Sequence, residues 1–306
     1  MGYLAFASAK ASPGVTTTVA ALAATWPEGR DVLVVELDPA GGDLVVRFDL
    51  ATDPGLVTLA AAGRRELDRG ILLAHTQPLM APAQPGGSRR LVLAGPVMAE
   101  QAVAALGAIK ARLTEVLSYP GLDVLVDCGR LDVGSPAERI ATQADLLVMV
   151  MRPVVAEVHH LRARLSTLRP RAVSLLSIGE GPYSVRELAD AVGAAPLATL
   201  PLDHRAAEAL TVGHPSALRV LRRSRLLRGA RAVADGLVSW VDPTSEGPKP
   251  PVVPEPARPS PAPPPPPPSY PPPPPPQGWY PPPAPGSGYP PPPPSQHPQP
   301  VEEQRS

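Results

Sequence analysis

The 306-residue sequence has one cysteine, Cys128, few aromatic residues and no net charge, because 28 Lys and Arg balance 28 Asp and Glu. A single cysteine excludes an intramolecular disulfide and suits a reducing cytosol. We expect Cys128 to be a buried packing residue, since no histidine lies near it in the sequence. The charge balance removes the simplest argument for a polyanion-binding protein.

Long hydrophobic runs are also missing. No apolar run approaches the roughly 20 residues that a membrane-spanning helix needs. The segment from Met1 to Ser8 is too short for a signal peptide and lacks its basic leader. We therefore expect a cytoplasmic protein.

Proline is distributed unevenly, and its distribution divides the chain. Of 47 prolines, 31 lie between Pro243 and Ser306, a stretch of 64 residues. Runs such as Pro263 to Pro268 have no amide donors and no apolar partners. We therefore expect a disordered, polyproline-rich tail over 243–306. Residues 1–242 are long enough to fold as one domain with a full core.

The first 242 residues alternate between two kinds of segment. Continuous apolar runs, typical of strands covered on both faces, occupy 32–37, 124–126, 146–151 and 172–178, with further strands expected at 3–7 and 90–94. Helical spacing occupies 17–25, 100–117, 136–142, 154–168, 184–192 and 216–238, and a surface loop is expected over 81–89. This alternation predicts an α/β domain with a doubly wound, mostly parallel sheet.

One segment has the position and composition of a phosphate-binding loop. It follows the first expected strand and opens the first helix, where backbone amides and a helix N-terminus face an anion. It consists of Lys10, Ala11, Ser12, Pro13, Gly14, Val15, Thr16 and Thr17.

Two later segments place an aspartate at the end of an apolar strand. The first contains Glu36-Leu37-Asp38-Pro39, and the second, 122–128, reaches Asp127. The Asp127 carboxylate suits Mg²⁺, which prefers hard oxygen ligands and keeps several waters. For Asp127 taken alone, a turn-capping aspartate is the alternative.

In this order the three segments resemble the motifs of the deviant Walker A ATPases, the ParA/MinD family of P-loop proteins. The family loop reads Lys-Gly-Gly-Val-Gly-Lys-Thr-Thr, and the resemblance covers approximately residues 1–240. It implies that the loop binds ATP and that Lys10 is the signature lysine, which reaches phosphate across a dimer interface. It also implies that Thr17 reaches a phosphate and that Thr16, Asp38 and Asp127 organise Mg²⁺.

The resemblance extends to catalysis and to the base. It implies that Asp38 orients the attacking water, so Lys10 and Asp38 are the expected catalytic residues. The segment Leu200-Pro201-Leu202-Asp203 resembles one that lies near the adenine in the family, which makes Pro201 and Asp203 candidate nucleotide-binding residues.

The loop also departs from the family pattern. Ala11 and Ser12 replace two glycines, Pro13 removes an amide donor, and Val15 occupies the position of the P-loop lysine. That lysine is a point charge on the phosphates, and a charge-assisted hydrogen bond contributes on the order of 1.5–3 kcal/mol. Its loss weakens binding by roughly ten- to a hundredfold. We therefore expect weak or absent ATP hydrolysis. Glu36 likewise replaces the first aspartate of the family's Asp-x-Asp-Pro.

The resemblance implies a nucleotide-dependent homodimer that positions or partitions a chromosome, a division site, or a secretion or pilus apparatus. The ending Gly41-Gly42-Asp43 is closest to the CpaE/TadZ branch, which serves pilus assembly. The alternative is a pseudo-ATPase scaffold that recruits a protein partner through its tail, where Pro267-Pro268-Ser269-Tyr270 matches a PPxY pattern.

Six arginines between Arg219 and Arg231 form the most basic stretch of the chain, with leucines on the same segment. One interpretation is a patch that binds non-specific DNA or a membrane surface, which would place the protein at the nucleoid or the membrane. The other is the last helix of the domain, with its leucines packed and its arginines in water.

Overall fold

The computed structural model describes residues 2–10, 12–80, 86–118, 121–212, 220–221 and 223–241. The expected tail over 243–306 and its boundary at residue 242 lie outside these residues and stay predictions. Ala11 and positions 81–85 of the predicted loop also lie outside them.

Within this part of the chain, eight strands form one sheet in the order β3-β4-β2-β5-β1-β6-β7-β8. The strands are β1 Tyr3–Ser8, β2 Val32–Glu36, β3 Gln77–Met80, β4 Arg90–Leu93, β5 Asp123–Arg130, β6 Leu146–Met151, β7 Val173–Ile178 and β8 Ala195–Leu200. Only the β3–β4 pair is antiparallel among the pairs described. The predicted doubly wound, mostly parallel sheet is confirmed.

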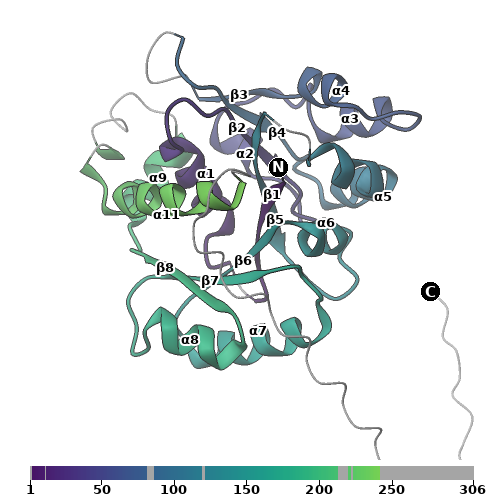
Figure 1. Ribbon diagram of the computed structural model, residues 1–306. Coiled ribbons are helices and arrows are strands. Elements are labelled where there is room, and N and C mark those ends of the chain that lie inside the picture. Colours follow the sequence, from purple (N-terminus) through teal and green to yellow (C-terminus); the bar gives the residue numbers. More distant parts are fainter. Residues whose placement is uncertain are drawn as a thin grey trace, which may run out of the picture. The chain divides into compact units, whose positions relative to one another are not determined.

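The helices of the described residues cover both faces of this sheet (Figure 1). They are α1 Val15–Thr25, α2 Leu44–Arg47, α3 Leu56–Ala62, α4 Arg69–Ala74, α5 Ala99–Val116, α6 Glu138–Gln143, α7 Val155–Thr167, α8 Val185–Val192, α9 His204–Val212 and α11 Arg225–Val241. One core packs α1, α2, α9 and α11 against the sheet, and the other packs α3 to α8 against the opposite face. Since both faces are covered, the central strands are continuous apolar runs.

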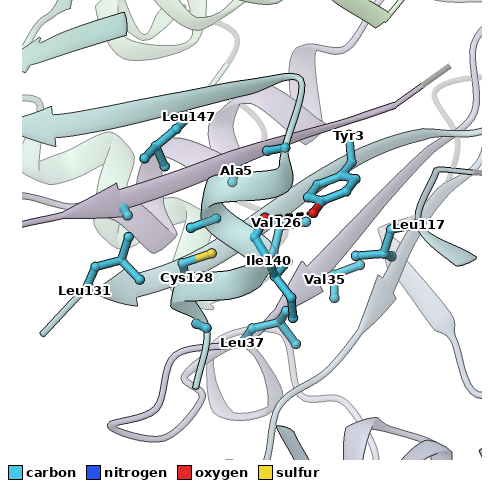
Figure 2. Close-up of a cluster of buried hydrophobic side chains, with 14 of the residues drawn as sticks. Tyr3, Ala5, Val35, Leu37, Leu117, Val126, Cys128, Leu131, Ile140 and Leu147 are labelled. Atoms are coloured by element: carbon cyan, nitrogen blue, oxygen red, sulfur yellow. Dashed lines mark hydrogen bonds between the residues drawn. The ribbon is translucent and has the colours of Figure 1, made fainter. Parts of the chain in front are cut away.

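Figure 2 shows part of the core on the α3-to-α8 side, where Tyr3 of β1 and Cys128 of β5 lie among aliphatic side chains. The Tyr3 hydroxyl donates a hydrogen bond of 2.7 Å to the Ile140 carbonyl of α6. Cys128 is fully buried, and burial raises the pKa of its thiol. The thiolate is the reactive form, so the prediction of a packing residue is confirmed.

The alternation of side chains along β5 decides which residues face α1. Val124, Val126 and Cys128 point into the core beneath α5 and α6, whereas Leu125 points into the core beneath α1. Because successive strand residues alternate between faces, Asp123 and Asp127 share the face of Leu125. The two aspartates therefore lie on the face that α1 covers, Asp123 at the start of the strand and Asp127 four residues further along it.

Two strands and four helices were not predicted from the sequence. The strands β3 and β8 contain Pro78 and Pro196, which argue against a central strand, but both lie at sheet edges, where proline is tolerated. The helices α2, α3, α4 and α9 are each nine residues or shorter. Such short segments carry little periodic signal.

The prediction of one helix over 216–238 is wrong, because the chain is not helical at Ser224 and α11 begins at Arg225. The Ser224 hydroxyl accepts a hydrogen bond of 3.2 Å from the Leu227 amide, which is the geometry of a helix N-cap. Along α11, Leu226 and Leu237 are buried while Arg225 and Arg228 are exposed. This arrangement agrees with a packed last helix whose arginines face water. None of the described helices is both long enough and apolar enough to cross a membrane.

Strand β1 lies between β5 and β6, and the chain builds the sheet outward from it in both directions. In open α/β sheets, ligands bind outside the carboxyl ends of the strands where the strand order reverses. That point lies at the end of β1, where the predicted phosphate loop begins.

Candidate functional site: a phosphate and magnesium corner

The loop after β1 ends at Gly14, which has φ +104° and is the N-cap of α1. This left-handed conformation favours glycine. The Gly14 carbonyl accepts hydrogen bonds from the Thr18 amide at 2.9 Å and the Thr18 hydroxyl at 2.8 Å. The amides of the first helical turn, at Val15, Thr16 and Thr17, have no acceptor within the helix, and no side chain caps them. They form an N-terminus suited to an anion.

The side chains of the loop point in different directions. Lys10 and Ser12 are exposed, Thr16 and Thr17 are half-buried, and Pro13 is buried. Val15 is only 6% exposed and packs in the core beneath α1 with Phe6 and Val19. The position of the missing lysine is therefore turned toward the core. Lys10 makes no ion pair with any other described residue.

Asp127, near the end of β5, is fully buried. Its Oδ1 accepts a hydrogen bond of 2.9 Å from the Gly129 amide, whereas its Oδ2 has no hydrogen-bond partner among the described residues. Burial raises the pKa of Asp127 to about 6, opposed by the Thr16 side chain and the Gly129 amide. A buried carboxylate oxygen without a partner is unfavourable unless a ligand supplies one.

Asp38 lies beside this carboxylate. Its Oδ1 accepts a hydrogen bond of 2.8 Å from the Ala40 amide, and burial raises its pKa. Gly129 has φ +57°, and a Cβ there would lie 2.0 Å from the carboxyl carbon of Asp38. Asp38 also raises the pKa of Asp127 by charge repulsion. The structure thus places Thr16 and Asp38 close to Asp127, and the binding of Mg²⁺ by these three residues stays a prediction.

Glu36 has a different part in the structure. It is buried, and its Oε1 accepts hydrogen bonds from the amides of Asp43 at 2.7 Å and Leu44 at 3.0 Å. Its Oε2 accepts one from the Gly95 amide at 3.0 Å. Burial, followed by repulsion from Asp127, raises the pKa of Glu36 to about 7. Glu36 therefore fixes the start of α2 to the loop that follows β4.

Sequence reasoning missed Arg47, the last residue of α2. Its Nη1 donates a hydrogen bond of 3.1 Å to the Thr17 hydroxyl, and its Nη2 donates one of 3.1 Å to Asp43 Oδ2. The Arg47 charge also lowers the pKa of Asp127. No sequence motif marks this residue, because it meets the loop only through the tertiary fold.

The predicted base-binding segment follows β8. Pro201 lines a pocket of about 300 Å³ together with Glu180, Thr199, Arg225 and Arg228. Asp203 has other partners, since its Oδ1 accepts a hydrogen bond of 3.1 Å from the Ala206 amide and its Oδ2 accepts one of 3.2 Å from the Ser224 hydroxyl. It caps α9 and holds the start of α11. A contact of either residue with adenine stays a prediction.

The residues of this corner fit the nucleotide and metal that the resemblance implies. The uncapped first turn of α1 suits phosphate oxygens, and the unpartnered oxygen of Asp127 beside Thr16 suits a hydrated Mg²⁺. The described residues include no cluster of three or more His, Cys, Asp or Glu side chains that would hold a metal by themselves. A magnesium ion would therefore depend on Thr16, on water and on phosphate oxygens as well.

No protein-family model matches the sequence, and no curated protein matches it significantly. The fold, in contrast, matches solved structures. A ParA family ATPase from Chlorobium tepidum TLS superposes with TM-score 0.59 at 17% identity, over 76% of this chain and 98% of that one. MinD from Pyrococcus horikoshii OT3, complexed with Mg-ADP, gives TM-score 0.51 at 17% identity, over 77% and 95%. A McdA–ATP complex from Cyanothece gives TM-score 0.54 at 16% identity, over 78% and 96%.

The described part of the chain therefore has the fold of the ParA/MinD family ATPases, a class of P-loop NTPases. At these identities the likeness extends to the fold alone. That Val15 takes the place of a loop lysine stays a prediction from the sequence.

Proposed function

We propose that this chain is a ParA/MinD-like switch that binds MgATP between the loop after β1 and the ends of β2 and β5. The observation that carries the proposal is the buried Asp127 oxygen, which has no hydrogen-bond partner in the described part of the chain and lies beside an uncapped helix N-terminus. Its cellular task would be intracellular positioning or partitioning, as the names of the proteins that share the fold suggest.

Each residue has a task in this proposal. The amides of Gly14 to Thr17 bind phosphate oxygens, and Thr16 and Asp127 hold the hydrated metal. Asp38 lies next to Asp127, where it orients a water toward the terminal phosphate. Bound Mg²⁺ would supply charge neutralisation, which together with positioning accounts for most of the catalysis of phosphoryl transfer.

Hydrolysis is proposed to be weak or absent because Val15 packs in the core and adds no charge to the loop. Lys10 is exposed, so it is available to reach the phosphates of a second subunit in a nucleotide-dependent homodimer. We place the protein in the cytoplasm, with peripheral attachment to the nucleoid or a membrane through the exposed arginines of α11 as a further possibility to test.

The direct test is titration of the full chain with MgATP, with light scattering to follow dimer formation. Wild type is expected to bind in the micromolar to millimolar range, and Asp127→Ala is expected to lose at least about tenfold in affinity, because the metal loses a carboxylate ligand. Asp190→Asn is the matched control, since it changes an exposed aspartate of α8. Absence of wild-type binding at millimolar MgATP would contradict the proposal.

A second function is a pseudo-ATPase scaffold, favoured by the burial of Val15. In that case the fold serves as a docking platform and the proline-rich tail recruits a protein partner. Deletion of residues 243–306 separates the two functions. Loss of partner recruitment with nucleotide binding intact assigns recruitment to the tail, whereas unchanged recruitment contradicts the scaffold function.

A further inference from the structure

The loop has valine, not lysine, at position 15, yet the structure brings a cation to it from another element. Three positive side chains of the described residues lie at or near the loop: Lys10, Arg152 and Arg47. Lys10 extends into solvent, and Arg152 Nη2 reaches only the Ser12 carbonyl, at 3.4 Å. Arg47 bonds the hydroxyl of Thr17, inside the turn whose amides are uncapped.

The position of Arg47 is fixed by its surroundings. The buried Glu36 carboxylate binds the amides of Asp43 and Leu44 and so holds the first turn of α2. The Arg47 amide in turn bonds the Asp43 carbonyl at 2.9 Å. Leu44 and Val45 pack in the core beneath α1. The guanidinium therefore projects from a short helix that is held on two sides.

The guanidinium also has unused donors. An arginine carries five N–H groups, and the bonds to Thr17 and Asp43 use two of them. The side chain is 25% exposed, so a ligand can reach it. Planar, forked donors bind phosphate oxygens in pairs.

We propose that Arg47 takes the place of the absent loop lysine and binds the phosphate chain of the nucleotide from the side of α2. The hydrogen bond to Thr17 holds the guanidinium at the loop before the nucleotide binds, whereas the ion pair with the exposed Asp43 is one that phosphate oxygens can replace. Glu36 acts as a positioning residue, because it anchors the helix that carries Arg47. This inference rests on the proposed function, since it concerns the same nucleotide.

The experiment is titration of the full chain with MgATP and with magnesium pyrophosphate. Arg47→Ala is expected to weaken binding of both about ten- to a hundredfold, and Arg47→Lys is expected to lose less, because it keeps the charge without the fork. Asp43→Asn is the matched control within α2. It removes the ion pair but leaves Arg47 free for phosphate, so affinity should stay the same or rise.

A second pair of variants tests whether Arg47 and the missing lysine supply the same charge. Val15→Lys should increase affinity more in the Arg47→Ala protein than in wild type, which is a coupling that a double-mutant cycle measures. Circular dichroism and melting temperature confirm that each variant is folded, because Val15 is a core residue. If the double variant does not fold, the comparison of Arg47→Ala, Arg47→Lys and Asp43→Asn decides alone.

The outcomes separate this inference from the function on which it rests. If wild type binds neither ligand, the proposed function fails and the inference fails with it. If wild type binds and Arg47→Ala binds equally well, only the inference is wrong. Equal losses of affinity in Arg47→Ala and Asp43→Asn would show that Arg47 acts by supporting α2. A loss of affinity in Arg152→Ala but not in Arg47→Ala would show that Arg152 supplies the charge. Either result overturns the inference.

Discussion

The two aspartates of β5 that lie under α1 have opposite surroundings. At the start of the strand, both oxygens of Asp123 are paired: Oδ2 accepts hydrogen bonds from Trp26 Nε1 at 2.7 Å and Arg30 Nε at 2.6 Å, and Oδ1 accepts one from Arg30 Nη2 at 2.7 Å. Four residues later, about 13 Å along the strand, Asp127 is fully buried with one oxygen unpartnered. The same residue type on one face of one strand is fully satisfied at one end and unsatisfied at the other.

The two aspartates therefore differ in role: Asp123 stabilises the fold, whereas Asp127 is a candidate ligand-binding residue. Asp123 ties the end of α1 to β5 through Trp26, the residue that follows the helix. Asp127 faces the start of the same helix, where a ligand is expected. A protein keeps an unsatisfied buried carboxylate at the expense of its own stability, and such groups concentrate at functional sites.

The largest expected change in stability is at Asp123, whose two carboxylate oxygens are both hydrogen-bonded. Asp123→Asn should lower the free energy of unfolding by about 3 kcal/mol, because it removes the buried carboxylate that pairs with Arg30 and accepts a hydrogen bond from Trp26. Urea denaturation measures the change. Asp132→Asn, in the exposed ion pair with Arg130, should change stability by less than about 1 kcal/mol. Equal losses of stability in Asp123→Asn and Asp132→Asn would show that the buried ion pair of Asp123 stabilises the fold no more than an exposed one.

At Asp127 the change in the free energy of unfolding should have the opposite sign. Without nucleotide or metal, Asp127→Asn should raise the free energy of unfolding by about 2 kcal/mol at pH 7.5, since it removes a buried charge. The native pKa of about 6 exceeds the ordinary 3.8, so the native state binds more protons between these values. Wild-type stability therefore falls as the pH rises through this window.

The variant lacks that titration, so its advantage should be absent near pH 4 and fully present above about pH 7. Urea denaturation in EDTA at several pH values measures the difference. An Asp127→Asn protein that is less stable than wild type at pH 7.5 would show that Asp127 is a structural residue like Asp123.

The smallest effect concerns the contact between Asp38 and Gly129. Gly129→Ala and Gly134→Ala both place alanine at positive φ, +57° and +77°, and this backbone strain alone should lower stability by about 1 kcal/mol at each position, with a further loss at 129 from the contact with Asp38. A Cβ at 129 meets Asp38, whereas one at 134 has no atom within 4 Å. Only Gly129→Ala should therefore also weaken MgATP binding, as titration of both variants would measure. If the two variants bind MgATP with equal affinity, Asp38 does not belong to the nucleotide site.

Much of this corner was predictable because its signals are local. The apolar runs of the central strands, the glycine before α1 and the strand-terminal Asp38 and Asp127 are sequence features, and parallel strands bring their carboxyl ends to one edge. Edge strands β3 and β8 were missed, since Pro78 and Pro196 are tolerated only where a strand has one neighbour.

The sequence by itself determined the doubly wound sheet and the position of the predicted phosphate loop between β1 and α1, because residue periodicity and turn composition are properties of neighbouring residues. Only the tertiary structure decided which side chains lie at this loop and which pack elsewhere. In the folded chain Val15 packs in the core, and Glu36 accepts hydrogen bonds that hold α2. Asp203 caps α9, and Arg47 contacts Thr17, thirty residues away in the chain. Such contacts depend on how distant segments pack, and no local pattern encodes them.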